Sequence, residues 1–274
     1  MSGDHTPIPL STSGNTAFDV AREVAKEGGN MIRERFLTEK KISFKGRSDI
    51  VTDVDLEVES LVLDKVRYEY PDFSVLAEES SPIQTNSEYT WVIDPIDGTR
   101  NFAEGIPHFC ILVALAKGSD VELGITYDPI KEELFTAQRG MGAFLNGEPI
   151  SVTDKVEISE CLLGFDLGYL DQKARTALDM IRSLWPGFQS MRLMGSAGLG
   201  MAYASAGRLD LYFHHSLSPW DMAAGLILAR EAGGAVVDRQ GNPANLFTPS
   251  VIVSSPRTVQ KFLVNTDGME WRTG

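Results

Sequence analysis

Apolar and polar positions follow a different pattern in each half of the chain. In the first half, apolar side chains at helical spacing predict one helix over residues 17–37 and a second over Leu56–Tyr70, which Pro71 ends. Short apolar segments bounded by turn residues then predict five strands: Phe73–Ala77, Trp91–Ile93, Phe109–Ala116, Val121–Tyr127 and Leu134–Ala137. We expect these strands to be antiparallel where their connections are short, and residues 140–149 to form a glycine-rich turn.

The second half alternates extended and helical segments. The predicted strands are Leu162–Phe165, Met191–Met194, Leu209–Phe213, Ala235–Val237 and Val251–Ser254. The predicted helices are Gln172–Leu184, Ala197–Ala206, Asp221–Ala232 and Pro256–Val264. This succession favours stacked layers of helices and sheets, with a soft boundary near residues 150–160.

Composition and charge exclude several classes of protein. The 274 residues are 43% hydrophobic, which excludes a disordered chain, and their formal net charge is −13. The acidic balance argues against nucleic acid or an anionic membrane as the partner. Residues 1–15 are polar and predict a flexible tail without a signal peptide, and the longest apolar run, Phe109–Ala116, is far shorter than the roughly 20 residues of a membrane helix. Two cysteines, Cys110 and Cys161, in apolar surroundings favour buried thiols in a reducing cytoplasm.

The most informative segment is WVIDPIDGTRNF, residues 91–102. Pro95 is expected to end the apolar strand, so that Asp94, Asp97 and the Ile96 carbonyl cluster in one tight turn. Two acids behind a buried strand favour a cation site, and the Gly98 and Thr99 amides can open a helix and hold an anion. The alternative is an ordinary Asx turn with a helix cap.

Further acids stand at the ends of other predicted elements. Glu78 and Glu79 follow an apolar strand, Asp221 stands in the first turn of a helix, and Asp53 and Asp55 precede another helix. Favourable interaction with the helix dipole is the alternative explanation for Asp221, and helix capping is the alternative for Asp53 and Asp55.

Carboxylates gathered from several elements repel one another unless protons or divalent cations neutralise them. Oxygen ligands without a cluster of His or Cys favour Mg²⁺ or Mn²⁺ over Zn²⁺. Two such ions ~4 Å apart activate water and stabilise a leaving oxygen in phosphoryl transfer.

These motifs resemble a known family. WVIDPIDGTRNF and PWDMAAGLILAREAGG, residues 219–234, resemble the two signatures of the inositol monophosphatase family, within the lithium-sensitive, Mg²⁺-dependent phosphatase superfamily. The order of motifs fits across about residues 17–255. The resemblance implies an α+β fold, the layered αβαβα sandwich of the inositol monophosphatase and fructose-1,6-bisphosphatase type, and a homodimer. It implies one domain over residues 16–274, in which the half at about 16–155 carries most metal ligands and the half at about 156–274 completes the site.

The resemblance also implies a role for each matching residue. The first metal ion is expected at Glu78, Asp94, Thr99 and the Ile96 carbonyl, the second at Asp94, Asp97 and Asp221, and a third, weaker ion near Glu78. The residues expected to act in catalysis are Asp55 with Thr99, which activate the attacking water, and Glu78. The residues expected to contact substrate are Asp97, Gly98, Thr99, Gly195, Ser196, Ala197, His214 and Asp221.

One position departs from the family pattern. Inositol-cleaving members often carry a Glu seven residues before the acid of the Trp-Asp pair, where this chain has His214. A neutral His214 can make one hydrogen bond to substrate, a protonated one can meet a second anionic group, and a rim histidine without substrate contact is the alternative. Adjacent residues of a strand point to opposite faces, so His214 and His215 are not expected to form a metal site.

The sequence thus predicts a cytoplasmic Mg²⁺-dependent phosphomonoesterase that acts on a small sugar or polyol phosphate. The alternatives are fructose-1,6-bisphosphate, histidinol phosphate and a 3′-phosphoadenosine nucleotide as substrate. A non-enzymatic alternative is a regulatory protein that binds RNA polymerase. The clustered acids favour the enzyme, because a scaffold has no physical need for them.

Overall fold

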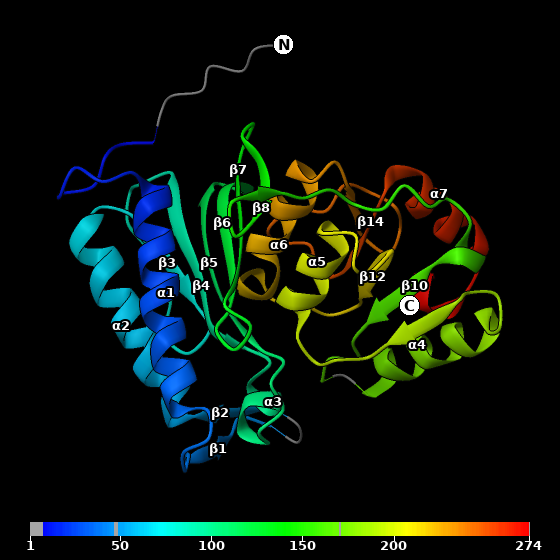
Figure 1. Ribbon diagram of the computed structural model, residues 1–274, viewed down its shortest axis with the longest axis horizontal. Helices are drawn as coiled ribbons and strands as arrows, with labels where there is room; N and C mark the ends of the chain where they lie inside the picture. Colours follow the sequence, from blue (N-terminus) through cyan, green and yellow to red (C-terminus); the bar gives the residue numbers. More distant parts are fainter. Residues whose placement is uncertain (1–7, 47–48, 170, 274) are drawn as a thin grey trace.

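Two long helices, α1 (Ala17–Arg35) and α2 (Asp53–Glu69), form the outer layer on one side of the computed structural model, which describes residues 8–46, 49–169 and 171–273. The Thr16 side chain caps α1 by accepting a hydrogen bond from the Asp19 amide. Thr52 and Asp55 form a capping box, so α2 begins at Asp53, three residues earlier than predicted. Figure 1 shows the two helices side by side against one face of a sheet.

That sheet has seven strands in the order β3-β4-β5-β6-β7-β8-β9. Their bounds are Ser74–Ala77, Tyr89–Asp97, Cys110–Lys117, Asp120–Asp128, Glu133–Gln138, Gly142–Leu145 and Glu148–Pro149. Strands β3 and β4 pair in parallel, and every later neighbour pairs antiparallel. The five strands predicted for this half are therefore confirmed, together with the antiparallel arrangement of the closely connected ones.

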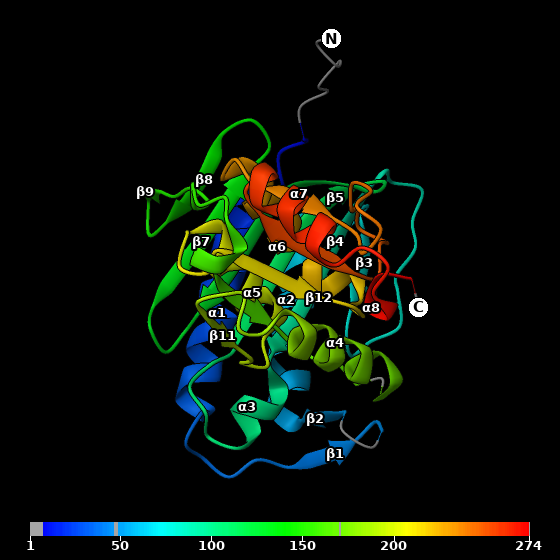
Figure 2. The ribbon, with the colours of Figure 1, turned by 90° about the vertical axis from the view of Figure 1, so that its right-hand side faces the viewer.

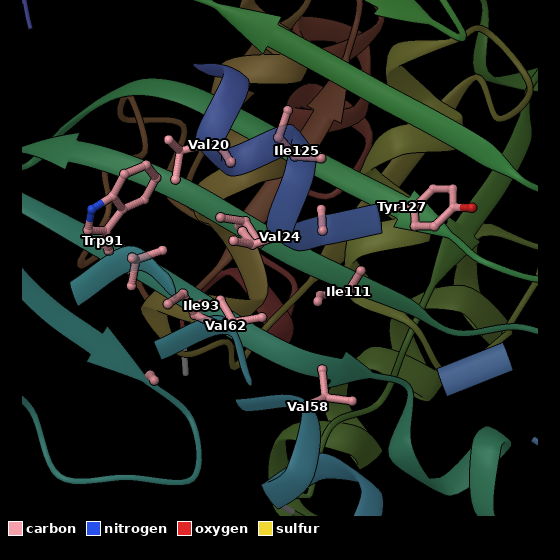
Figure 3. Packing of buried hydrophobic residues seen from close by; sticks show 14 of the residues in the cluster. Val20, Val24, Val58, Val62, Trp91, Ile93, Ile111, Ile125 and Tyr127 are labelled. Atoms are coloured by element: carbon pink, nitrogen blue, oxygen red, sulfur yellow. The ribbon is translucent and has the colours of Figure 1, made fainter. Parts of the chain in front are cut away.

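Strand β5 shows why this sheet has helices on both faces. Its two faces are both apolar: Phe109, Ile111, Val113 and Leu115 pack on one side and Cys110, Leu112, Ala114 and Ala116 on the other. The first set meets Val20, Val24, Val58 and Val62 of α1 and α2 in the core shown in Figure 3. Because a strand that is apolar on both faces must be covered twice, this sheet becomes an inner layer.

The middle layer consists of α5 (Ala197–Ser205) and α6 (Pro219–Glu231), which pack between the two main sheets. The second sheet has the order β11-β10-β12-β14-β13. Its strands are β10 (Leu162–Phe165), β11 (Ser190–Arg192), β12 (Leu211–His214), β13 (Ala235–Val237) and β14 (Val251–Ser254). A short 3-10 helix, η1 (Ile158–Glu160), precedes β10.

The last layer contains α4 (Asp171–Leu184), α7 (Pro256–Asn265) and α8 (Glu270–Thr273). Figure 2 shows these helices in front of the second sheet, where Met180, Phe262 and Trp271 pack against Phe213 and Ile252. The order helices, sheet, helices, sheet, helices is the predicted αβαβα sandwich.

Several short elements differ from the prediction. Strands β1 (Ile42–Phe44) and β2 (Ile50–Thr52) pair as a separate hairpin, and β8 and β9 lie where a glycine-rich turn was predicted. All three residues of β1 are exposed, and a strand of three residues is too short for its apolar–polar alternation to predict it. A five-residue helix, α3 (Thr99–Ala103), follows Gly98, as the helix-opening prediction for that turn requires.

Part of the predicted flexible tail, residues 1–15, is packed against the rest of the protein. Residues 1–7 lie outside the described part, but Ser11 is buried, and the Thr12 amide donates to the Glu69 carbonyl at 2.9 Å. The Glu69 side chain accepts hydrogen bonds from the amide and hydroxyl of Ser13. These contacts hold the segment against the end of α2. No helix among residues 8–46, 49–169 and 171–273 has the length and apolar character to cross a membrane.

Candidate active site

A cleft of 630 Å³ gathers the predicted site residues from elements far apart in the chain. Eleven of the twelve line it: Glu78, Asp94, Ile96, Asp97, Gly98, Thr99, Gly195, Ser196, Ala197, His214 and Asp221. The twelfth, Asp55, is fully buried behind Thr99. The cleft lies where the end of β4 meets the first residues of α5 and α6.

The end of β4 differs from the predicted tight turn. The strand continues through Pro95 to Asp97, and its register with β5 shifts between Asp94, which faces Leu112, and Asp97, which faces Cys110. From Asp94 to Asp97 strand β4 advances by three residues while β5 advances by two, and the extra residue on β4 forms a β-bulge. Pro95 removes one amide from the ladder without ending the strand, and the bulge directs both acids into the cleft.

Three carboxylates form the centre of the cleft. Asp94, Asp97 and Asp221 each offer an oxygen atom, and these atoms lie within 4.8 Å of one another. Burial raises the pKa of Asp94 well above its ordinary value, and the charges of Glu78, Asp97 and Asp221 raise it further. Asp94 Oδ1 is buried and has no hydrogen-bond partner among the described residues. An unsatisfied carboxylate oxygen beside two further acids fits a divalent cation, and a set of oxygen donors fits Mg²⁺ or Mn²⁺.

Asp97 is held by the beginning of α5. Its Oδ2 accepts hydrogen bonds from the Ser196 hydroxyl and from the Gly198 amide at 2.8 Å, and its Oδ1 accepts from the Ala197 amide at 3.1 Å. The Cys110 thiol donates to Oδ2 at 3.5 Å. Burial raises the pKa of Asp97, and these hydrogen bonds oppose the rise. The carboxylate is therefore fixed in place by groups from the first sheet and from the beginning of α5.

Asp221 combines the two roles that its position suggested. It is the third residue of α6, and its Oδ2 accepts the Ser218 amide at 2.7 Å in a capping box. Burial and the charge of Asp97 raise its pKa well above the ordinary value. The same carboxylate thus caps the helix and contributes to the acidic cluster.

Glu78 lies beside this cluster and forms an ion pair with Lys45, a residue that the sequence analysis did not single out. Lys45 Nζ is 3.1 Å from Glu78 Oε1 and 2.6 Å from Glu79 Oε1. Burial raises the pKa of Glu78 to about 7, although Lys45 opposes the rise. The Glu79 amide also donates a hydrogen bond to the Glu59 side chain. This structural contact agrees with the sequence analysis, which assigns Glu79 no role as a metal ligand. Lys45 stands in a loop without any motif, so only the structure places it here.

Thr99 and Asp55 are in contact, as the resemblance implies. The Thr99 hydroxyl lies 3.0 Å from Asp55 Oδ1 and 2.8 Å from the Ile96 carbonyl oxygen. Asp55 Oδ2 accepts hydrogen bonds from the Thr52 amide and hydroxyl, which orients the carboxylate. Burial raises the pKa of Asp55, and the hydrogen bonds from Thr52 and Thr99 oppose it. Asp55 thus contacts Thr99, which lines the cleft, but does not line the cleft itself.

Two residues that sequence reasoning missed hold the Gly195 segment over Gly98. The Asn101 side-chain amide lies 2.7 Å from the Met194 carbonyl oxygen and 2.8 Å from that of His108. Asp166 Oδ1 accepts the amides of Met194 and Gly195 at 3.0 and 2.6 Å. Burial raises the pKa of Asp166 to about 6. Both residues act through long-range contacts that no local pattern announces.

His214 lines the cleft, but its surroundings correct two expectations. Burial, followed by the charge of His215, lowers its pKa to about 3, so the ring is neutral and the protonated form is excluded at neutral pH. The rings of His214 and His215 stack with centroids 5.3 Å apart, so the two side chains do not point to opposite faces. The alternation fails because β12 ends at His214 and the chain turns there.

Asp53 and Arg100 each form an ion pair with a nearby side chain. Asp53 pairs with Arg35 at 3.0 Å and accepts the Lys41 amide, and it does not line the cleft. Arg100 lines the cleft and lies 3.7 Å from Glu104 in an exposed ion pair.

Comparisons with known proteins agree with this geometry. The model of the inositol monophosphatase family matches residues 15–267. Nus factor SuhB of Escherichia coli strain K12 is 37% identical over 252 residues, which cover 90% of this chain and 94% of that protein. Inositol monophosphatase of Dictyostelium discoideum is 38% identical over 248 residues, with 88% and 91% covered.

Solved structures confirm the fold class. Extragenic suppressor protein SuhB from Bartonella henselae superposes with a TM-score of 0.87 at 31% identity, covering 91% of this chain and 98% of that one. The Thermotoga maritima IMPase superposes with a TM-score of 0.85 at 33% identity, covering 93% and 98%.

Proposed function

Because the chain belongs to the inositol monophosphatase family, we propose that it is a Mg²⁺-dependent phosphomonoesterase that acts on a small phosphorylated metabolite. The observation that carries the proposal is the cluster of Asp94, Asp97 and Asp221, with Asp94 Oδ1 buried and unpaired. Such a cluster is stable at neutral pH when cations or protons compensate its charge. The expected sugar or polyol phosphate is one class of substrate for such a site.

The ligand sets follow from the residues that meet in the cleft. Glu78, Asp94, Thr99 and the Ile96 carbonyl are proposed to hold one ion, and Asp94, Asp97 and Asp221 the second, with a third near Glu78. When bound, Mg²⁺ acts as a Lewis acid that polarises the phosphoryl group and makes water more acidic, and Mn²⁺ is a possible substitute.

The chain's own groups orient the reactants and move protons. The Thr99 hydroxyl, held by Asp55, is proposed to accept a proton from the attacking water and pass its own to Asp55 Oδ1. The amides of Gly98 and Thr99 are proposed to donate hydrogen bonds to phosphate oxygens, where charge develops. The hydrogen bonds from Ala197 and Gly198 to Asp97 hold the residue that precedes these amides.

Phosphate release from glycerol 2-phosphate tests the proposal, because this small ester needs few contacts outside the phosphate site. We expect release with Mg²⁺, none with EDTA, and none from Asp94→Asn. The matched control is Glu122→Gln, which removes a buried acid outside the cleft and is expected to retain turnover. Equal turnover with and without EDTA would refute the proposal.

A second candidate function rests on the names of relatives. Several of them, at 34–37% identity, are named Nus factor SuhB, and a regulatory protein that binds RNA polymerase is therefore the alternative. Co-sedimentation of the wild type with purified RNA polymerase, together with no Mg²⁺-dependent hydrolysis of glycerol 2-phosphate, would favour this function over the enzyme.

We also propose a cytoplasmic homodimer. The support for a reducing compartment is that Cys110 and Cys161 are both free and buried. The support for a dimer is an exposed apolar surface at the edge strand β11 and the loop after it, where Met191 is 44% and Met194 37% exposed. Light scattering of the wild type and of Met191→Glu measures the oligomeric state, and an unchanged dimer in the variant would place the interface elsewhere.

A further inference from the structure

The cleft has an apolar wall. It is built by the loops that follow β10, β11 and β12 and by the first turn of α6. The three strands are neighbours that run parallel, so their carboxyl ends lie at one edge of the sheet. We call the apolar wall the set Leu167, Tyr169, Leu193, Leu217 and Trp220. Tyr169 is 60% and Leu193 52% exposed, so these side chains are accessible from the cleft.

Two polar side chains that line the cleft beside the apolar wall have little capacity left to accept hydrogen bonds. Asp166 belongs to the same loops, but its Oδ1 already accepts two amides and its Oδ2 accepts the Tyr212 hydroxyl at 2.9 Å. The other group is His214, whose Nδ1 accepts the Ser216 amide at 3.0 Å. A neutral imidazole that accepts at Nδ1 carries its proton on Nε2, so His214 can only donate there.

The donor nitrogen of His214 is held at the surface of the cleft. Gly168 packs against the Cε1 and Nε2 edge of the ring, where a Cβ atom on residue 168 would lie 3.1 Å from Cε1. Gly168 has φ +57°, so a larger residue would be both strained and too close. In the described part of the chain, Nε2 has no hydrogen-bond partner.

We propose that the apolar wall and His214 bind the alcohol half of the substrate, and that this alcohol is flat and mainly apolar, such as an aromatic alcohol, with one hydrogen-bond acceptor for His214 Nε2. This rests on the proposed function and names the substrate class. A polyol suits this wall less well, because hydroxyl groups that face Leu167, Leu193 and Leu217 would lose water without gaining hydrogen bonds from these side chains.

The chemical step is ordinary hydrolysis. The water oxygen forms a bond to phosphorus, the ester oxygen leaves with its bonding electron pair, and that oxygen takes up a proton. The products are the free alcohol and inorganic phosphate, so no oxidant, reductant or second substrate is required.

The test compares kcat/KM for four esters with Mg²⁺: 3-pyridylmethyl phosphate, benzyl phosphate, myo-inositol 1-phosphate and glycerol 2-phosphate. We expect the pyridylmethyl ester to exceed the benzyl ester, and the benzyl ester to exceed the inositol ester by about tenfold or more. In His214→Glu, which replaces a donor by an acceptor, we expect the ratio of inositol to pyridylmethyl ester to rise about tenfold or more. Ratios within one variant are insensitive to a partial loss of folded protein.

His215→Gln is the matched control, because His215 is equally buried and stacks on His214 but does not line the cleft. Its ratios are expected to stay at the wild-type values. Calorimetric titration with benzyl phosphonate, which is not hydrolysed, gives a second readout, and it should bind more tightly than the phosphonate analogue of the inositol ester. Hydrolysis of glycerol 2-phosphate together with a preference for the inositol ester would overturn this inference and leave the phosphatase intact. Absence of Mg²⁺-dependent hydrolysis of all four esters would overturn both.

Discussion

Ser196 donates a hydrogen bond from its hydroxyl to Oδ2 of Asp97, a residue 99 positions earlier in the chain. The same hydroxyl accepts the Leu199 amide and so caps α5. One side chain thus connects the end of β4, in the first sheet, to the helix layer between the sheets. The geometry of the acidic cluster therefore depends on how the two halves of the chain pack together.

Replacement of Ser196 by Ala should weaken both the fold and the metal site. The loss of the cap and of the hydrogen bond to Asp97 should lower the free energy of unfolding by about 1–2 kcal/mol in EDTA. Since Asp97 would lose one of its fixed contacts, the Kd for Mg²⁺ should rise. Urea denaturation and calorimetric titration measure the two effects.

The control for this change is Ser205→Ala, in the same helix. The Ser205 hydroxyl is buried and donates to the Met201 carbonyl at 2.8 Å, without any contact to the acids. We expect Ser205→Ala to lose some stability and to bind Mg²⁺ with the wild-type Kd. Equal Mg²⁺ affinities in the two variants would mean that Ser196 does not position Asp97.

Asp94→Asn should stabilise the metal-free protein while it removes the response to metal. The neutral amide ends the repulsion of Asp94 with Glu78, Asp97 and Asp221 and is nearly the same size. In EDTA the melting midpoint should rise, by roughly 2–4 °C for each 1 kcal/mol gained. Added Mg²⁺ should raise the midpoint of the wild type but not of the variant, because only a ligand that binds the native state stabilises it.

Thermal melting with and without Mg²⁺ gives all four midpoints in one series. A variant that melts below the wild type in EDTA, yet shifts equally with Mg²⁺, would show that Asp94 is neither repelled nor a ligand.

Metal-free stability should fall as the pH rises. The pKa of Glu78 is raised from its ordinary 4.5 to about 7 in the folded protein. Between these values the folded state binds more protons than the unfolded state, so the free energy of unfolding decreases with increasing pH. The pKa values of Asp94 and Asp221 are raised in the same direction and steepen this slope. Protons compete with cations for these oxygens, so Mg²⁺ affinity should increase over the same range.

Chemical denaturation in EDTA at several pH values between 4.5 and 7 measures the slope. Glu78→Gln should flatten it, because the amide does not titrate. A stability that increases with pH in this window would contradict the raised pKa of Glu78 in the folded protein.

The sequence was most informative where one local pattern decides the outcome. Phe109–Ala116 is apolar at every position, which predicts a strand covered on both faces, and β5 is such a strand. The hairpin of β1 and β2 escaped prediction because each strand has only three residues, too few for the alternation of Ile42, Ser43 and Phe44 to stand out. Its formation depends on contacts with other elements, which a local window does not contain.

The functional site also has parts that a local motif predicts and parts that it does not. Asp94 and Asp97 stand in one motif, and a resemblance assigned them a shared ion before any geometry was known. Lys45, Asn101 and Asp166 act on the site from separate segments through contacts between residues 7 to 93 positions apart, and no spacing rule predicts them. The alternation rule failed at His214 because it holds inside a strand and not at its last residue.

Gly98 should not tolerate a side chain, because its backbone is both left-handed and closely surrounded. Its φ is +95°, and a Cβ atom would lie 3.1 Å from the His108 carbonyl oxygen and 3.2 Å from that of Gly195. Gly98→Ala should therefore lower the free energy of unfolding by about 1–3 kcal/mol. It should also lower kcat/KM by about tenfold or more, since the turn from Asp97 to Thr99 must shift.

Gly105→Ala separates strain from close contact. Gly105 also has a positive φ, +74°, but no atom lies within 4 Å of a Cβ built there. This control should lose roughly 1 kcal/mol through backbone strain and keep kcat/KM within about twofold of the wild type. Urea denaturation and steady-state kinetics of both variants give the comparison. If both variants lose the same stability and the same activity, then the close carbonyl oxygens of His108 and Gly195 are not the reason for glycine at position 98. The left-handed backbone alone would then explain it.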